Sequence, residues 1–291
     1  MIPFILSILA SSLIFVIFKL FKKYNIDTFQ AIVVNYFTAA LIGFIFYGNT
    51  WKPEAMEQNG WMLYAVIASL LFIFIFFILG RSSQENGVAS TSIAVKMSMA
   101  ISLVLLIVYH SESPSLLKIG GIVLAFIGVL LVSVPEKKAG EKSKYLWMLL
   151  ILFFGCGGLD FLLNYVQDHE LTILQPSLFS AISLGLSGVI GLVILTAKMA
   201  KGTTKIEGKN IIAGLILGVP NFFSIYLLLL SYKSTGWEGS TVLALTNVSV
   251  VLLSSFFGFL FFREATTSKK IIGLITAVLA IATLYIAEQN F

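Results

Sequence analysis

Long apolar segments alternate with short polar segments along the whole chain, and this pattern predicts a bundle of membrane-spanning helices. A helix of about 20 residues crosses the roughly 30 Å hydrocarbon core of a bilayer. Ten segments have about that length, with expected limits at 3–21, 28–47, 61–80, 87–109, 115–134, 145–165, 174–197, 210–230, 238–262 and 268–287. None of the loops between them is long enough to hold a soluble domain. We therefore predict an all-α integral membrane protein with ten transmembrane helices.

The composition supports a membrane protein. Of the 291 residues, 58% are hydrophobic and only 11% are charged, whereas a soluble domain has about 25% charged residues. The single cysteine, Cys156, excludes an internal disulfide and a cysteine-rich metal site. No cofactor or metal is predicted.

The basic residues predict an orientation. Of the 19 Lys and Arg residues, all but Lys52, Lys96, Lys118 and Lys233 lie in the loops after the first, third, fifth, seventh and ninth helices. By the positive-inside rule these loops are cytoplasmic, so both termini are expected outside the cytoplasmic membrane. The net charge of +5 therefore reflects topology, and we predict no nucleic-acid partner. The basic residues follow the first apolar segment, the reverse of a secretory signal, so this segment is expected to stay as a helix.

The two halves of the chain show weak internal similarity. A shift of 145 residues places Gln30 on Gln175, and a shift of 152 places Glu112 on Glu264. Five helices per half is an odd number, so the halves must cross the membrane in opposite directions. Such inverted repeats are typical of alternating-access transporters, although a duplicated scaffold without transport is the alternative. The expected units are residues 1–137, a cytoplasmic linker at 138–144, and residues 145–291.

The end of each half carries a recognisable pattern. The second half has "GSTVLALTNVSVVLLSSFFGFLFFREATTSKKIIGLITAVLAIATLYIA", with Glu264 between two helices, and the first has "ASTSIAVKMSMAISLVLLIVYHSESPSLLKIGGIVLAFIGVLLVS", with Glu112. The chain thus resembles the EamA-like ten-helix branch of the drug/metabolite transporter superfamily. That resemblance implies a metabolite exporter, with amino acids or similar amphipathic compounds as substrates. Members of that branch often have a proline midway along the fourth and ninth helices, and neither helix has one here.

Two charged residues, Lys96 and Asp160, lie deep in predicted helices, where a charge is costly unless it has a function or a partner. Lys96 is about nine residues, or roughly 14 Å, from the inner end of its helix, so its side chain cannot fully reach the membrane surface. It either binds substrate in a cavity, extends toward the surface, or forms a structural hydrogen bond, and we predict the first. Asp160 is either a proton carrier, a cation site, the counter-ion of Lys96, or a residue near the outer interface.

Two uncharged residues are expected beside Lys96. Asn247 is its repeat mate at an offset of 151, and Ser92 lies one turn earlier on the same helical face. A polar residue at both symmetric positions suits two helices that line one central cavity.

The eighth predicted helix contains Pro220 and Asn221 near its centre. A proline there indicates either a broken helix that lines the substrate site or a plain kink, and Asn221 is a candidate substrate ligand. Three further candidates either contact the substrate or only bond to neighbouring helices: Asn35, Tyr36 and Gln175. Arg81, Arg263 and Glu264 lie at inner helix ends and are interpreted as solvated topology anchors, with gate ion pairs as the alternative.

The sequence contains neither a phosphate-binding loop nor a nucleophile–histidine–acid set, so we expect a protein that is not an enzyme. We predict a secondary active transporter that exports a small organic metabolite, such as the amino acids implied by the resemblance, coupled to protons or to an exchanged solute. Its partners are the substrate and the lipid bilayer, and a homodimer is left open. The alternatives are a sugar or nucleotide-sugar carrier on the same fold and a lipid-translocating membrane protein.

Overall fold

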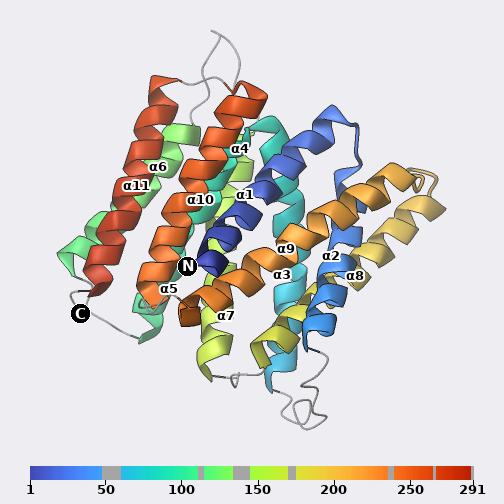
Figure 1. Ribbon diagram of the computed structural model, residues 1–291, viewed down its shortest axis with the longest axis horizontal. Coiled ribbons are helices and arrows are strands. Elements are labelled where there is room, and N and C mark those ends of the chain that lie inside the picture. The colour runs from blue at the N-terminus through green and yellow to red at the C-terminus, as the bar shows by residue number, and fades with distance from the viewer. Residues whose placement is uncertain are drawn as a thin grey trace.

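The computed structural model describes residues 1–47, 60–110, 115–133, 145–169, 175–234, 239–264 and 267–289. Every regular element in these ranges is a helix (Figure 1). The helices are α1 (Ile2–Lys23), α2 (Thr28–Tyr47), α3 (Gly60–Glu85), α4 (Val88–Met97), α5 (Met99–His110), α6 (Leu116–Ser133), α7 (Leu146–His169), α8 (Gln175–Ala200), α9 (Gly208–Ser234), α10 (Gly239–Phe262) and α11 (Ser268–Gln289).

All ten predicted helical segments are helical in the structure. The fourth is divided into α4 and α5 at Ser98, while α3 and α9 extend several residues beyond their expected ends. Within the described ranges, nine segments are long and apolar enough to cross a membrane when α4 and α5 count as one, and α6 contributes a shorter apolar helix. The prediction of an all-α, multi-pass membrane protein is confirmed.

The helices form one bundle with two distinct sides. At one side α6 packs along α11, and at the other α2 packs between α8 and α9 (Figure 1). Between them α1 contacts α9, α10 and α3, and α4 contacts α10 and α7. Small residues allow the closest approaches: a Cβ atom on Gly218 of α9 would lie 2.5 Å from Thr38 Cβ of α2. Glycines at helix contacts are typical of membrane bundles, where packing rather than water exclusion drives association.

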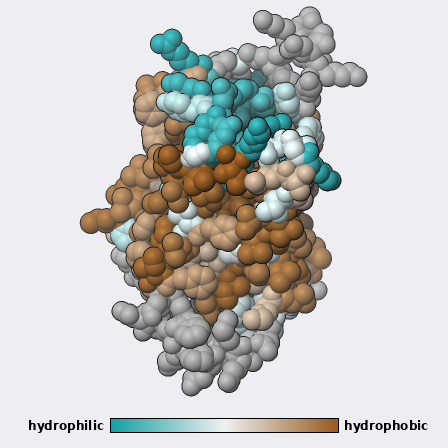
Figure 2. Space-filling model, turned by 90° about the vertical axis from the view of Figure 1, so that its right-hand side faces the viewer, coloured by the Kyte–Doolittle hydropathy of each residue, from teal (hydrophilic) through white to brown (hydrophobic). Residues whose placement is uncertain are grey.

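The surface has a hydrophilic cap at one end and a broad hydrophobic band below it (Figure 2). We call the capped end the lysine-rich end; its basic residues in the described ranges are Lys19, Lys22, Lys23, Arg81, Lys198, Lys201, Lys205, Lys209, Arg263, Lys269 and Lys270. α1 begins and α11 ends toward the opposite end of the bundle (Figure 1). This is the arrangement that the distribution of basic residues predicts, although which end faces the cytoplasm stays a prediction.

Candidate functional site

The interruption between α4 and α5 is centred on Ser98, two residues after Lys96. The backbone of Ser98 stays in the right-handed helical region, with φ −56° and ψ −21°, so the two helices continue in the same sense. The Ser98 carbonyl accepts hydrogen bonds from Ile101 N–H at 2.9 Å and Ser102 N–H at 3.2 Å. The Ser98 hydroxyl donates to the carbonyl of Val95, and such back-bonding often bends a helix.

α7 packs directly against this interruption. A Cβ atom on Gly157 would lie 2.7 Å from the Ser98 carbonyl oxygen and 2.5 Å from Ile101 Cβ, so only glycine fits there without a shift. Because α4 belongs to the first half of the chain and α7 to the second, the interruption lies at the interface between the halves.

Lys96 and Asp160 interact across this interface. Both side chains are partly buried, and the Lys96 amine and the Asp160 carboxylate attract each other electrostatically. Ser98 Oγ lies 3.4 Å from Asp160 Oδ2, and the buried thiol of Cys156 is one turn earlier on α7. The structure therefore groups an amine, a carboxylate and a hydroxyl within a hydrophobic bundle.

Asn247 reaches the same region from α10. Its side-chain amide donates to Met99 Sδ at 3.3 Å, and the residue is 6% exposed. Met99 is the first residue after the interruption. Lys96 and Asn247, the predicted repeat mates, thus lie on neighbouring helices. We call the set Lys96, Ser98, Asp160 and Asn247 the interruption site.

Several other predicted candidates have structural roles or lie elsewhere. Ser92 is fully buried and its hydroxyl donates to the carbonyl of Ala89, while the buried Tyr36 hydroxyl donates to the carbonyl of Phe72. Gln175 begins α8, but its side chain lies outside the described residues.

Asn35 and Asn221 are buried on α2 and α9, a pair of helices that pack closely together. Within the described ranges, neither α2 nor α9 has a substantial contact with α4 or α5. Both side-chain amide atoms of Asn35, and Nδ2 of Asn221, have no hydrogen-bond partner among the described residues. The predicted polar candidates therefore divide between the interruption site and the α2–α9 pair.

Sequence reasoning missed the environment of Glu264, at the lysine-rich end. Its side chain is only 7% exposed, so the interpretation as a solvated anchor is wrong for this residue, whereas Arg81 and Arg263 are exposed as expected. Its carboxylate accepts hydrogen bonds from Val88 N–H at 2.8 Å and Ala89 N–H at 3.4 Å, and Lys19 Nζ lies 3.4 Å away. The repeat mate Glu112 lies outside the described residues.

Glu264 fits this position because two glycines make room for it. Gly87 precedes α4 with φ +95°, a conformation that side chains rarely adopt, and a Cβ atom there would lie 2.7 Å from the carboxylate. A Cβ atom on Gly258 would lie 2.9 Å from Oε2. A carboxylate is also stabilised at a helix N-terminus by the unpaired N–H groups and the helix dipole. We call Glu264, Gly87, Gly258, Lys19 and the first amides of α4 the Glu264 cradle.

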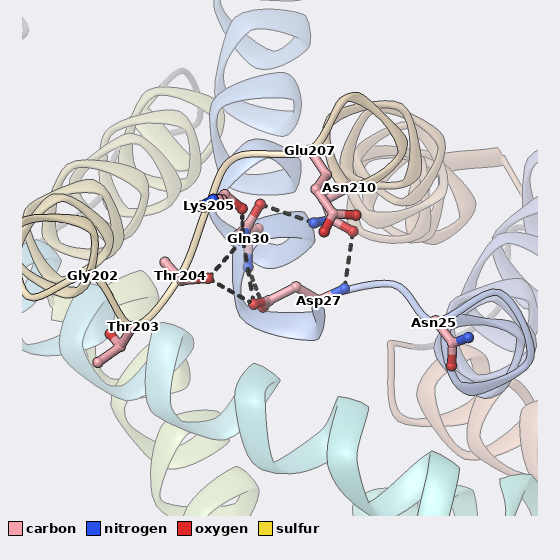
Figure 3. Close-up of a pocket in the computed structure, with 9 residues that line it drawn as sticks. All are labelled: Asn25, Asp27, Gln30, Gly202, Thr203, Thr204, Lys205, Glu207 and Asn210. Carbon is pink, nitrogen blue, oxygen red and sulfur yellow. Dashed lines mark hydrogen bonds between the residues drawn. The ribbon is translucent and has the colours of Figure 1, made fainter.

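A polar cavity of about 340 Å³ also opens at the lysine-rich end (Figure 3). The α1–α2 connection supplies Asp27 and α2 supplies Gln30, while Asn210 comes from the start of α9. Asn210 bonds to Gln30 Oε1 at 2.9 Å and to the Asp27 amide at 3.0 Å, and Gln30 Nε2 donates to the Lys205 carbonyl at 2.9 Å. These side chains form hydrogen bonds with one another and so hold the α1–α2 connection to the α8–α9 connection. We call Asp27, Gln30 and Asn210 the Gln30 clasp.

No group of three or more His, Cys, Asp or Glu residues that could hold a metal ion occurs among the described residues. Among these residues, polar side chains gather at the interruption site, along the α2–α9 pair and in the two clusters at the lysine-rich end.

Comparison with known proteins finds a family whose model matches the first part of the chain. Residues 1–134 match the EamA-like transporter family. The match confirms the resemblance noted in the sequence and, with the apolar helices, supports a multi-pass membrane protein of the EamA transporter type.

Two further similarities cover nearly the whole chain. The chain is 28% identical over 293 residues to an uncharacterized protein of Haemophilus influenzae, with 98% of each chain covered. It also superposes on a protein of known crystal structure with a TM-score of 0.60 at 12% identity, covering 98% of this chain and 99% of the other. At that identity the likeness establishes the fold alone.

Proposed function

We propose that the protein is a secondary transporter that moves a small organic solute across the cytoplasmic membrane by alternating access, most simply as an exporter. The observation that carries the proposal is the 3.4 Å approach of Asp160 on α7 to Ser98, two residues after Lys96, which brings opposite charges from the two halves together inside an apolar bundle. Ionisable groups inside a membrane protein mark substrate or ion pathways.

Helix contacts support an inverted-repeat relation between the halves. If the first five segments (α1, α2, α3, α4–α5 and α6) correspond to α7, α8, α9, α10 and α11, most contacts have a counterpart. The contact of α2 with α9 corresponds to that of α8 with α3, and the contact of α1 with α9 to that of α7 with α3. The contacts α2–α8, α4–α10 and α6–α11 map onto themselves. In transporters built this way, the substrate site lies near the midplane at the repeat interface, and the contact of α4 and α5 with α7 at the interruption site is consistent with such a position.

The chemistry of the interruption site favours a solute with both an anionic and a cationic or hydrogen-bonding group. Lys96 offers ammonium donors to a carboxylate, and Asp160 offers an acceptor to an amine. An amino acid fits this pair, in agreement with the substrate class that the resemblance implies. Asp160 is equally placed to carry the proton of a coupled exchange.

Counterflow in proteoliposomes tests the proposal. Vesicles loaded with a panel of amino acids are expected to accumulate at least one labelled member. Lys96→Met is expected to lower that rate by about a hundredfold, because removing one partner of a buried charge pair costs a few kcal/mol. Lys209→Met is the matched control, since Lys209 is exposed and, among the described residues, pairs only with Glu207, which directly precedes α9.

Two outcomes would contradict the proposal. Unchanged counterflow with Lys96→Met would remove Lys96 from the substrate path. Counterflow of sugars or nucleotide sugars, with none of any amino acid, would replace the proposed solute by the alternative carrier class.

A further inference from the structure

Both polar clusters at the lysine-rich end join the first half of the chain to the second. In the Glu264 cradle, Lys19 and the start of α4 belong to the first half and Glu264 to the second. In the Gln30 clasp, Asp27 and Gln30 belong to the first half and Asn210 to the second. The described residues at this end are therefore tied together by polar contacts across the repeat interface.

The packing of α1 on α3 closes the same end. The Phe18 and Phe76 rings lie 5.6 Å apart, and a Cβ atom on Gly80 would lie 2.8 Å from the Phe18 ring. Lys19 Nζ also donates to the Gln84 carbonyl at 3.3 Å. Lys19 thus contacts α3 and Glu264 together, so it links the helix packing to the cradle.

In the second half, the helices that correspond to α1 and α3 are α7 and α9, and these two pack differently. Under the proposed repeat relation, the α1–α3 contact at the lysine-rich end corresponds to an α7–α9 contact at the opposite end. Within the described ranges, α7 and α9 have no comparable contact. When an inverted-repeat transporter changes state, the contact at one end opens and its counterpart at the other end closes. The presence of the α1–α3 contact and the lack of a comparable α7–α9 contact are therefore expected of a conformation closed at the lysine-rich end.

We propose that Glu264 is the latch of a gate at the lysine-rich end: its carboxylate holds α1 and α4 of the first half to the α10–α11 connection of the second, and it must leave the cradle before this end opens. The inference rests on the proposed transport function and assigns to one residue the step that opens the path. The Gln30 clasp is a second contact between the halves, and it opens when the Glu264 cradle opens.

The cradle is suited to a reversible contact. The bonds of the Glu264 carboxylate to Val88, Ala89 and Lys19 are charge-assisted, so the closed state is stabilised more strongly than by neutral hydrogen bonds. On departure, Lys19, the first amides of α4 and the carboxylate itself lie at the end of the bundle, where water can solvate them. Neither Lys19 nor Glu264 is then left buried without a partner.

Hydrogen–deuterium exchange of the full chain in lipid nanodiscs tests the latch without a substrate. Glu264→Gln keeps the size of the side chain but removes its charge. We expect peptides from the lysine-rich ends of α1, α3 and α4 to exchange about tenfold faster, the effect of losing one set of charge-assisted hydrogen bonds. Peptides from the opposite ends of α7 and α9 are expected to exchange more slowly, because those ends close when the lysine-rich end opens.

The slower exchange at the far ends is the decisive measurement. Loss of a helix cap alone would accelerate exchange only at the start of α4. Lys19→Met, which keeps the α4 cap and removes the ion pair, is expected to give the same two-ended pattern with about a threefold change, the size of a partly exposed ion pair. Lys209→Met, which removes a positive charge at the same end outside both clusters, is expected to change neither end.

Unchanged exchange at the far ends of α7 and α9 in both Glu264→Gln and Lys19→Met would overturn the latch. So would the same two-ended pattern in Lys209→Met, because the change would then reflect surface charge. Either result would leave the Lys96 counterflow experiment unaffected, so failure of the latch and failure of the transport proposal are distinguishable. If Glu264→Gln does not fold, Lys19→Met decides the matter.

Discussion

Proline usually kinks or breaks a helix, but two helical regions of this molecule show the opposite. α9 contains Pro220 and continues from Gly208 to Ser234 without a break. The fourth span contains no proline, yet its helix is interrupted at Ser98. The interrupted helix holds Lys96, and the proline-containing one holds the buried Asn221. The presence of proline therefore does not determine where a helix breaks in this bundle.

Neighbouring helices contact both regions closely. α9 lies tightly along α2, with Gly214 and Gly218 so close to Val34 and Thr38 that no side chain fits. Pro220 removes one backbone hydrogen bond, and membrane helices tolerate this when neighbours hold the helix in place. At Ser98 an equally close glycine contact, from Gly157 of α7, coincides with a polar one, because the Ser98 hydroxyl lies 3.4 Å from Asp160 Oδ2 on the same helix. The interruption thus coincides with a polar contact from a neighbouring helix, and proline is not required for it.

The largest expected effect comes from filling that contact. Gly157→Ala places a methyl group 2.5 Å from Ile101 Cβ, so the helices must separate, and we expect a loss of about 1 to 3 kcal/mol in stability. Gly158→Ala is the matched control because a Cβ atom there meets nothing within 4 Å. Thermal unfolding in detergent, followed by tryptophan fluorescence, compares the two. Equal Tm values would show that α7 does not hold the interruption.

Ser98→Ala should have a smaller effect. It removes a hydroxyl that bonds to Val95 and lies 3.4 Å from Asp160 Oδ2, whereas Ser92→Ala removes only a bond to Ala89 within the same span. The difference in stability between the two variants reports the Ser98–Asp160 contact, and we expect about 1 kcal/mol. Denaturant unfolding of both variants measures it. A difference of zero would mean that the hydroxyl serves α4 alone.

The smallest effect is expected at Pro220. Pro220→Ala restores one hydrogen bond to a helix that is already continuous, so stability should rise by less than about 1 kcal/mol, well below the roughly 3 kcal/mol cost of proline in a soluble helix. The same thermal unfolding experiment checks this. A clear fall in Tm would indicate that α2 and α9 pack around the proline ring itself, and the contrast with Ser98 would then need another explanation.

The helices were predictable because each depends on a continuous apolar segment of fixed length. Lys96 and Asp160 were predictable as candidates because a charge within an apolar segment is visible in the sequence. Their interaction was not, because it depends on how α4 and α7 pack. Ser92 and Tyr36 were also visible as polar residues, but their hydroxyls bond to nearby main-chain carbonyls rather than lining a common site.

Glu264 shows most clearly what could not be predicted from the sequence. In the sequence it is a charged residue in a short polar loop, for which solvation is the ordinary outcome. In the structure it accepts a hydrogen bond from Val88, 176 residues away, and its space is made by Gly87 and Gly258. Such a position requires three separate segments to meet, and nothing in the local pattern around residue 264 encodes that meeting.

The sequence by itself determined that the protein lies in a membrane, how many helical segments it has and roughly where they end, and that its basic residues gather at one end. These properties follow from transfer free energies that act residue by residue along the chain. Only the tertiary structure decided where a helix is interrupted, which charge lies beside Lys96, and which carboxylate is buried at the lysine-rich end. Those outcomes depend on contacts between helices distant in sequence, where one missing Cβ atom or one aligned N–H group determines the arrangement.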